Sequence, residues 1–215
     1  KAAHLCPASG KMSLAEEYKK QFEWRDWSTA LSKCPITPGQ YVLDLGCAIG
    51  DLSRELASRG AIVTGVDANA ELLTVARNQS YPNCTFIEQD LTSLTLDRQF
   101  DGLWCSFAAA YFTNFDEVFA GWTNQLSDTA WICISEVDNL LGHEPLSPRS
   151  RQLVESFYDE ALRSRRYDFT MGRRVEPIVK SHGFAVTTTY LTDKELSFNG
   201  PANTTVLQAW TNRFN

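Results

Sequence analysis

A short glycine-containing loop is the part of this sequence best suited to bind a ligand. The loop occupies residues 43–51, LDLGCAIGD, and follows an apolar stretch. Gly46 and Gly50 allow the backbone to turn sharply and to come close to a bound group. A helix is expected directly after the loop, and the free N–H groups at its start attract a negatively charged group. This combination predicts a cofactor site at the carboxyl edge of an α/β sheet.

Two glycine patterns compete for this loop. Dinucleotide-binding proteins require G-x-G-x-x-G, and counting from Gly46 puts Ala48 at the second glycine and Asp51 at the third. Asp51 does not fit, because the third glycine serves close packing of helix and strand. The other pattern, acid-x-G-x-G-x-G, is met by Asp44, Gly46, Ala48 and Gly50. Ala48 replaces the middle glycine, where a positive φ would destabilise the loop by about 1–2 kcal/mol.

The apolar stretches that follow the loop also end in polar residues. Asp67 closes the second stretch, and a carboxylate there can accept two hydrogen bonds from ribose hydroxyls. Asp90 follows the third stretch, and Ser106 and Phe107 close the fourth. With these motifs in this order, the sequence over residues 41–137 resembles the class I, Rossmann-like methyltransferases that use S-adenosylmethionine.

The resemblance implies that S-adenosylmethionine is the cofactor and that the matching positions bind it. Asp67 would bind the ribose, while Ala68 and Leu72 flank the adenine. Asp90 would accept a hydrogen bond from the adenine amino group, and the backbone N–H of Leu91 would meet a ring nitrogen. The expected cofactor-binding residues are Tyr18, Asp44, Gly46, Cys47, Ala48, Gly50, Asp67, Ala68, Leu72, Asp90, Leu91 and Ser106.

Three of these residues have structural alternatives. Asp44 also fits an ordinary acid at a strand end. Asp90 also fits the N-cap of a helical turn, since aspartate is a preferred cap. Cys47 is expected to pack as a small apolar side chain rather than to act as a nucleophile, and to meet the cofactor through its backbone.

The expected acceptor site draws on aromatic and basic side chains outside the loop. The resemblance implies that an N-terminal helix covers the cofactor, with Tyr18 at the methionine carboxylate and Trp24 or Trp27 stacked on the acceptor. The alternative is that these aromatics pin the helix to the domain. By residue type His143 is the best candidate for a general base and Tyr111 the second, although a loop histidine also fits a plain surface position. The expected acceptor-binding residues are Trp24, Trp27, Phe107, Tyr111 and Arg173.

Two subclasses of the family are disfavoured by the tip of the fourth strand. Asp138 and Asn139 are similar to the metal-binding pair of catechol-type O-methyltransferases. That site also needs an acid where Ser106 and Phe107 stand, so no metal is expected. The same tip lacks the [Asn/Asp]-Pro-Pro-[Tyr/Phe] stretch of enzymes that methylate exocyclic amines of DNA bases or amide groups.

Alternating apolar stretches and helical patterns predict an α/β domain with helices on both faces of its sheet. By resemblance the Rossmann-like sheet has seven strands, mostly parallel, with the last strand antiparallel. A tail and helical cap are expected over residues 1–38. The methyltransferase domain is expected over 39–215, with a helical insertion at 139–182 that frames the acceptor pocket. Strands are expected over Tyr41–Leu45, Ala61–Val66, Cys84–Glu88, Gln99–Phe107, Ala130–Val137, Phe184–Leu191 and Thr204–Trp210.

Bulk properties narrow the class of partner. The net charge of −6 disfavours a broad nucleic-acid-binding surface, and no apolar run is long enough to span a membrane. The six cysteines form no C-x-x-C pair and three lie in apolar, strand-like sequence, so they are expected to be reduced in a cytoplasmic setting. A six-cysteine disulfide framework is the alternative. A monomer or homodimer is expected. The expected function is methyl transfer by in-line displacement to a small-molecule oxygen or nitrogen acceptor. The alternatives are a tRNA or protein methyltransferase that uses the arginines of residues 149–174, and a non-catalytic protein that binds the cofactor. A salt-bridged helix surface is the plain explanation of those arginines.

Overall fold

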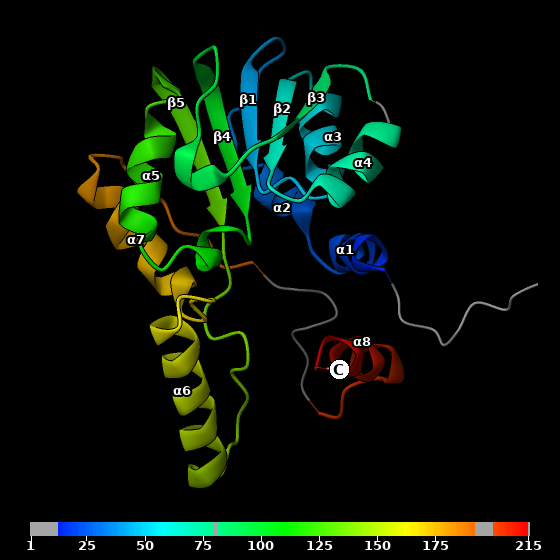
Figure 1. Cartoon of the computed structure of the whole chain (residues 1–215), viewed down its shortest axis with the longest axis vertical. Coiled ribbons are helices and arrows are strands. Elements are labelled where there is room, and N and C mark those ends of the chain that lie inside the picture. Colours follow the sequence, from blue (N-terminus) through cyan, green and yellow to red (C-terminus); the bar gives the residue numbers. More distant parts are fainter. Residues whose placement is uncertain (1–12, 80, 192–199, 215) are drawn as a thin grey trace, which may run out of the picture.

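The computed structural model describes residues 13–79, 81–191 and 200–214 and centres on a parallel β-sheet (Figure 1). Within the described residues the sheet has five strands in the order β3-β2-β1-β4-β5, and every pair is parallel. The sheet grows from β1 in both directions, so the carboxyl ends of β1 and β4 form a switch point where such folds bind ligands. The strands are β1 (Tyr41–Leu45), β2 (Ile62–Asp67), β3 (Cys84–Glu88), β4 (Phe100–Ser106) and β5 (Leu126–Ser135).

Helices bury both faces of the sheet, which explains why its central strands are continuous apolar runs. On one face α2 (Trp27–Leu31) and α3 (Asp51–Ser58) pack on Val42 and Trp104. On the other face α5 (Phe115–Thr123) and α7 (Met171–Ser181) pack on Leu43 and Leu103. The remaining helices are α1 (Leu14–Glu23), α4 (Ala70–Asn78), η1 (Leu91–Ser93), η2 (Ala109–Tyr111), α6 (Pro148–Arg163) and α8 (Thr204–Phe214).

The prediction of two strands at the end of the chain is wrong. The predicted seven-stranded sheet with an antiparallel last strand is therefore also wrong within the described residues. Residues 184–191 form no strand, although Phe184 packs edge-on against Phe119 of α5. Residues 204–214 form α8, where the side chain of Asn203 accepts a hydrogen bond from the N–H of Val206 (2.9 Å). This N-cap outweighs the β-branched residues that suggested a strand. Residues 192–199 lie outside the described residues.

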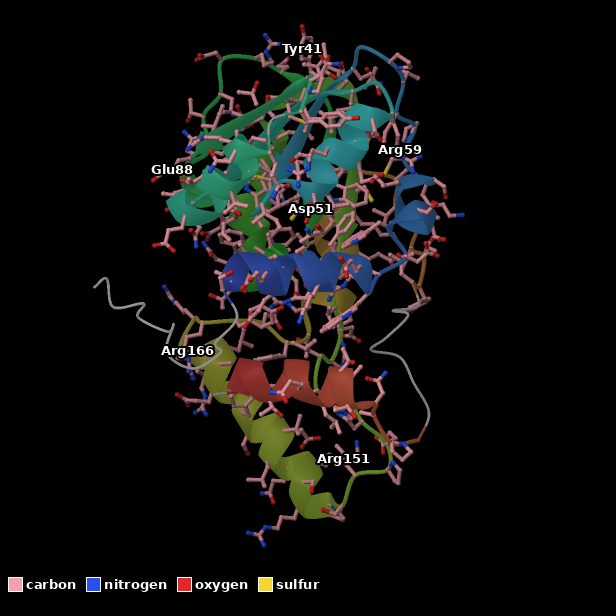
Figure 2. The ribbon with its side chains drawn as sticks, turned by 90° about the vertical axis from the view of Figure 1, so that its right-hand side faces the viewer. Tyr41, Asp51, Arg59, Glu88, Arg151 and Arg166 are labelled. Atoms are coloured by element: carbon pink, nitrogen blue, oxygen red, sulfur yellow. The ribbon has the colours of Figure 1, made fainter. Side chains whose placement is uncertain are left out.

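The expected N-terminal cap divides into two helices with different environments. α1 begins at a capping box formed by Ser13 and Glu16 and buries none of its residues. α2 buries Trp27 in the core of the domain. Figures 1 and 2 place α1, α6 and α8 beyond the carboxyl ends of the strands. The expected tail over residues 1–12, which includes Cys6, lies outside the described residues.

The segment after β5 also divides into two parts. α6 projects away from the sheet (Figure 1), whereas α7 buries Met171 and Val179 in the core beside α5. The part of the segment nearest to the sheet is therefore built into the domain core. None of the helices in the described part of the chain is long and apolar enough to cross a membrane.

Candidate functional site at the carboxyl edge of the sheet

The glycine loop turns tightly between β1 and α3. Gly46, Ala48 and Gly50 all have positive φ values of 73°, 47° and 77°. The N–H groups of Gly46 and Cys47 both donate to the carbonyl of Val66, at 2.8 and 3.1 Å. These two hydrogen bonds fasten the loop to the end of β2, at the switch point of the sheet.

Close packing explains why glycine stands at two of these positions. A Cβ on Gly46 would lie 2.6 Å from the Cβ of Ala108, so the glycine lets the loop approach the chain that follows β4. A Cβ on Gly50 would lie 2.6 Å from the ring of Phe86 on β3. The glycines therefore serve both the turn and the contact of the loop with neighbouring strands.

We expect Gly46→Ala to lower the free energy of unfolding by about 2–5 kcal/mol, because it adds a clash to an unfavourable positive φ. The clash is with Ala108, so Ala108→Gly in the same chain should recover part of the loss. Urea unfolding of the wild type, both single variants and the double variant gives the coupling energy. Strictly additive effects would contradict the contact.

Asp67 at the end of β2 is held in place by the same loop. Its Oδ2 accepts a hydrogen bond from the N–H of Ala48 (2.9 Å), and its Oδ1 accepts one from the N–H of Asn69 (2.8 Å). A carboxylate has about four acceptor sites, so about two remain for the hydroxyls of a ribose. The residues present therefore fit a nucleoside at this edge.

Asp44 and Cys47 lie behind the loop. The Asp44 carboxyl is 1% exposed and accepts a hydrogen bond from Ser53 Oγ of α3 at 2.5 Å. Burial raises the pKa of Asp44 to about 7, with Ser53 acting against that rise and the negative charge of Asp67 adding to it. Burial also raises the pKa of the Cys47 thiol, which keeps the thiol protonated. Asp44 thus ties β1 to α3, and Cys47 packs as an apolar side chain.

The residues expected around the adenine lie at the ends of β2 and β3. Ala68 is exposed just after β2, and Leu72 is buried in the first turns of α4. Asp90 is exposed and caps the short helix η1, where its Oδ1 accepts hydrogen bonds from the N–H and Oγ1 of Thr92 (both 2.8 Å). These hydrogen bonds hold the pKa of Asp90 below its usual value. Leu91 is buried directly after it. The structural alternative for Asp90 is thus realised, and its contact with adenine stays a prediction.

The tip of β4 meets the N-terminal helices. Phe107 has a positive φ of 56°, and the guanidinium of Arg25 lies over its ring at 4.2 Å from the centroid. Trp27 packs edge-on against Phe107 at 5.8 Å and donates its indole N–H to the carbonyl of Phe22. Trp27 is only 8% exposed, so it pins α2 to the domain. Trp24 is half-buried at the end of α1.

Glu136, which the sequence reasoning missed, follows β5 directly. Its two carboxylate oxygens accept hydrogen bonds from the N–H groups of Ala110 (3.1 Å) and Val137 (3.0 Å). Burial raises the pKa of Glu136 to about 7, although these hydrogen bonds and the charge of Arg25 lower it. Glu136 therefore couples the ends of β4 and β5 beside the N-terminal helices. An acid at the end of an apolar strand is the same signal that marked Asp67.

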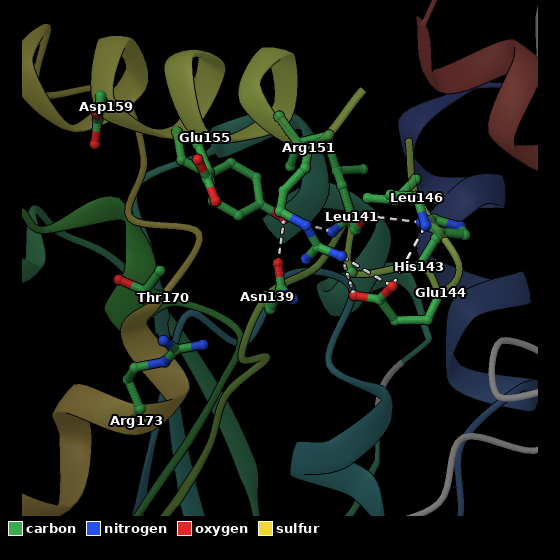
Figure 3. A pocket seen from close by; sticks show the side chains of 13 residues that line it. Asn139, Leu141, His143, Glu144, Leu146, Arg151, Glu155, Asp159, Thr170 and Arg173 are labelled. Carbon is green, nitrogen blue, oxygen red and sulfur yellow. Dashed lines mark hydrogen bonds and ion pairs between the residues drawn. The ribbon is translucent and has the colours of Figure 1, made fainter. Parts of the chain in front are cut away.

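A separate polar hollow of about 300 Å³ lies between α6 and the loop after β5 (Figure 3). His143 and Arg173 both line it. His143 is exposed, and its Nδ1 lies 2.7 Å from the carbonyl oxygen of Leu141. Arg173 donates to Asp138 at 2.7 Å. Both side chains are therefore already engaged in local contacts. The lining residues are Asn139, Leu141, Gly142, His143, Glu144, Leu146, Arg151, Val154, Glu155, Tyr158, Asp159, Thr170 and Arg173.

Comparison with known proteins identifies a methyltransferase domain within the chain. Residues 42–128 match the sequence model of a family described as "Methyltransferase domain". The match runs from β1 into β5 and includes the glycine loop, Asp67 and Asp90. The chain carries a class I, S-adenosylmethionine-dependent methyltransferase domain. The resemblance drawn from the motifs is confirmed.

The proteins similar to this chain include methyltransferases that are named for different substrates. The chain is 48% identical over 71 residues to a ubiquinone biosynthesis O-methyltransferase of Coxiella burnetii, which covers 31% of the chain and 30% of that protein. It is 26% identical over 126 residues to a trans-aconitate 2-methyltransferase of Escherichia coli, covering 58% and 49%. A crystal structure of an S-adenosylmethionine-dependent methyltransferase from Mesorhizobium loti is 26% identical, with a TM-score of 0.50 over 53% of the chain and 54% of that protein. The chain thus spans less than half the length of these two curated relatives.

The methyltransferase domain brings together one group of the expected residues and leaves others apart. The glycine loop, Asp67 and the tip of β4 meet at the switch point. His143 and Arg173 share the hollow beside α6. Tyr111 is 57% exposed and packs edge-on against Tyr167. Tyr18 is half-buried on α1. The roles of these residues in binding and catalysis stay predictions.

The positive φ of Ala48 yields a further prediction for the methyltransferase loop. We expect Ala48→Gly to raise the free energy of unfolding by about 0.5–1 kcal/mol, because relief of the left-handed strain exceeds the added chain entropy of glycine. Ala68→Gly is the matched control, since its φ is not positive, and it should lower the same quantity. Thermal and urea unfolding measure both. A less stable Ala48→Gly variant would contradict the strained geometry.

Proposed function

We propose that this chain transfers a methyl group from S-adenosylmethionine to an oxygen or nitrogen atom of a small-molecule acceptor. The observation that supports this most is the cradle at the switch point. There, the three positive-φ residues of the loop lie beside the fixed Asp67 carboxylate, and Gly46 packs on Ala108 after β4. Two curated relatives, a ubiquinone biosynthesis O-methyltransferase and a trans-aconitate 2-methyltransferase, favour a small acceptor.

The residues of the chain would bind and orient the reactants and keep water out. Asp67 would accept hydrogen bonds from the ribose, and the loop backbone would lie against the rest of the cofactor. The bound sulfonium supplies an electrophilic methyl group. Phe107, with Arg25 and Trp27 packed over it, would close one side of the methyl site, because in-line transfer requires a dry and well-oriented site.

A proton acceptor is required only for an acceptor that keeps its proton at the working pH. His143 and Tyr111 stay our candidates for this role. His143 belongs to the hollow beside α6, and Tyr111 lies in η2 after β4. A His143→Gln variant and a Tyr111→Phe variant separate the two, since a general base lost from the enzyme lowers kcat without a matching change in cofactor affinity.

Salt bridges around the arginines favour a small acceptor over RNA. Arg151, Arg163, Arg173 and Arg174 pair with Glu144, Glu160, Asp138 and Asp168. An arginine that is paired with a carboxylate is less available to bind an RNA phosphate. If the chain did bind RNA through its arginines, the affinity would fall steeply as the salt concentration rises. This pairing matches the plain explanation of a salt-bridged helix surface.

The test is calorimetric titration with S-adenosylmethionine, followed by an acceptor screen that detects S-adenosylhomocysteine. Phenols, carboxylates, amines and bulk tRNA are the acceptor arms. We expect micromolar binding and turnover with one small-molecule class. Turnover with tRNA alone would overturn the small-molecule proposal. Binding without turnover on any arm would favour a non-catalytic protein, and no binding would contradict the cofactor site itself.

A further inference from the structure

One carboxylate oxygen at the end of the glycine loop is buried without a hydrogen-bond partner. Asp51 follows Gly50 at the start of α3, and its Oδ2 atom is buried and accepts no hydrogen bond from the described residues. Its other oxygen, Oδ1, pairs with a guanidinium nitrogen of Arg54. Buried polar groups are nearly always hydrogen-bonded, and a buried charged group without a partner is the most costly exception. Asp51 Oδ2 therefore marks a place for a donor that the described protein groups do not supply.

Arg54 fixes the Asp51 carboxyl but does not satisfy this oxygen. One terminal nitrogen of the guanidinium donates to the carbonyl of Ile49 in the loop (3.1 Å), and the other donates to Asp51 Oδ1. The two side chains are only 15% and 21% exposed, so water and salt screen their charges weakly. The carboxyl is therefore held in one position beside the loop, with Oδ2 left to a further donor.

Asp51 lies at the same edge of the sheet as the expected ribose contact. Ala48, three residues earlier in the loop, donates its N–H to Oδ2 of Asp67 (2.9 Å). A side chain on a helix tilts toward the helix N-terminus, so the Asp51 carboxyl lies on the loop side of α3. In Figure 2 Asp51 lies at the end of α3 that is turned toward α1, beyond the carboxyl ends of the strands. The unpaired oxygen therefore belongs to the cofactor side of the domain.

The methionine half of S-adenosylmethionine is the chemical complement of this arrangement, because it carries an ammonium and a carboxylate on one carbon. An ammonium supplies a positive charge and three N–H donors, and hydrogen bonds between ions are about twice as strong as neutral ones. The N-cap of α3 is Gly50, which makes no side-chain cap, so the first N–H groups of the helix suit the carboxylate. The acid at position 51 suits the ammonium.

We propose that Asp51 binds the amino group of the cofactor, with Oδ2 accepting a hydrogen bond from the α-ammonium while Asp67 takes the ribose. Asp51 is then a specificity-determining residue. An adenosine compound that lacks the α-amino group leaves Oδ2 buried without a partner, and it binds more weakly for that reason. This inference rests on the cofactor and its site, and it does not depend on the acceptor or on methyl transfer.

The experiment is calorimetric titration of the full chain with S-adenosylhomocysteine and with its deaminated analogue, in which hydrogen replaces the α-amino group. We expect the wild type to bind the deaminated analogue about 10- to 100-fold more weakly, because one hydrogen bond between ions is lost. Asp51→Asn should bind S-adenosylhomocysteine with a similar loss. It should bind the two ligands almost equally, because the variant lacks the charge that distinguishes them.

Two control variants separate this contact from general damage to the site. Glu55→Gln removes an exposed carboxylate from the same helix, one turn further on, and should keep the wild-type difference between the two ligands. Asp67→Ala should weaken the binding of both ligands by the same factor, because both carry the ribose. A thermal melting curve shows that each variant is folded.

Three results would overturn the proposal. One is a wild-type chain that binds both ligands equally well, and this result requires no variant. A second is an Asp51→Asn chain that keeps the wild-type preference for the ligand with the amino group, whatever its overall affinity. The third is a wild-type chain that binds neither ligand, which would contradict the whole cofactor site. The first two results leave that site intact, so failure of this inference is distinguishable from failure of the proposed function.

Discussion

Asp67→Ala should lower the affinity for S-adenosylmethionine by about 100-fold or more. The substitution removes two expected hydrogen bonds between a carboxylate and ribose hydroxyls, and hydrogen bonds to charged groups contribute about 1.5–3 kcal/mol each. It also leaves the N–H of Ala48 without the carboxylate that holds the glycine loop. Isothermal titration calorimetry of the folded variant measures the loss.

Two further variants make this test specific. Asp67→Asn keeps the size of the side chain but has a single acceptor oxygen, so it should fall between the wild type and Asp67→Ala. Asp97→Ala removes an exposed carboxyl that lies in the loop before β4, at the opposite edge of the sheet, and should bind like the wild type. Unchanged affinity in the folded Asp67→Ala chain would show that the ribose is not bound at this position.

Raising the pH from about 4 to about 8 should lower the free energy of unfolding of the cofactor-free chain by several kcal/mol. Burial raises the pKa of Asp44 from 3.8 and that of Glu136 from 4.5, each to about 7. Between the unfolded and folded pKa values the folded chain holds protons that the unfolded chain has released. This stabilisation is complete below the unfolded pKa values and is lost as the pH rises through about 7.

Asp44→Asn and Glu136→Gln should each remove part of this pH dependence, by an amount on the order of 3 kcal/mol. Urea unfolding at several pH values measures it. Glu144→Gln is the control, because its carboxyl is exposed and the hydrogen bond from Arg151 holds its pKa below the usual value. A wild-type chain whose stability rises between pH 5 and 8, or an Asp44→Asn chain with the wild-type slope, would contradict the buried protonated carboxyls.

The segment that follows β4 contacts several of the residues whose substitution is proposed above. Glu136 holds Ala110 after β4, while Gly46 packs on Ala108 two residues earlier. Arg25 lies over Phe107 in the same segment. A change in the charge of Glu136 is therefore expected to act on the segment that we propose lies beside the methyl site. The pH dependence of cofactor binding is then a second readout of the Glu136→Gln variant.

Local signals in the sequence were sufficient to locate the glycine loop and Asp67 at the carboxyl edge of the sheet. The glycine loop is recognisable because positive φ values and a following helix impose short-range residue preferences. Asp67 is recognisable because it ends a buried strand at the expected spacing. The parallel orientation of the first five strands follows from the alternation of strands and helices along the chain. These features depend on residues that are close together in the chain, so they can be predicted from the sequence pattern.

Only the tertiary structure decided the remaining features, because they depend on contacts between distant residues. The β-branched residues of 204–210 suggested a strand, but a strand needs a hydrogen-bonded partner, and the Asn203 cap instead begins a helix. Trp27 was as compatible with an acceptor as with the core until its contacts with Phe22 and Phe107 placed it in the core. Such pairings follow from how the helices fold onto the sheet, which no local pattern records.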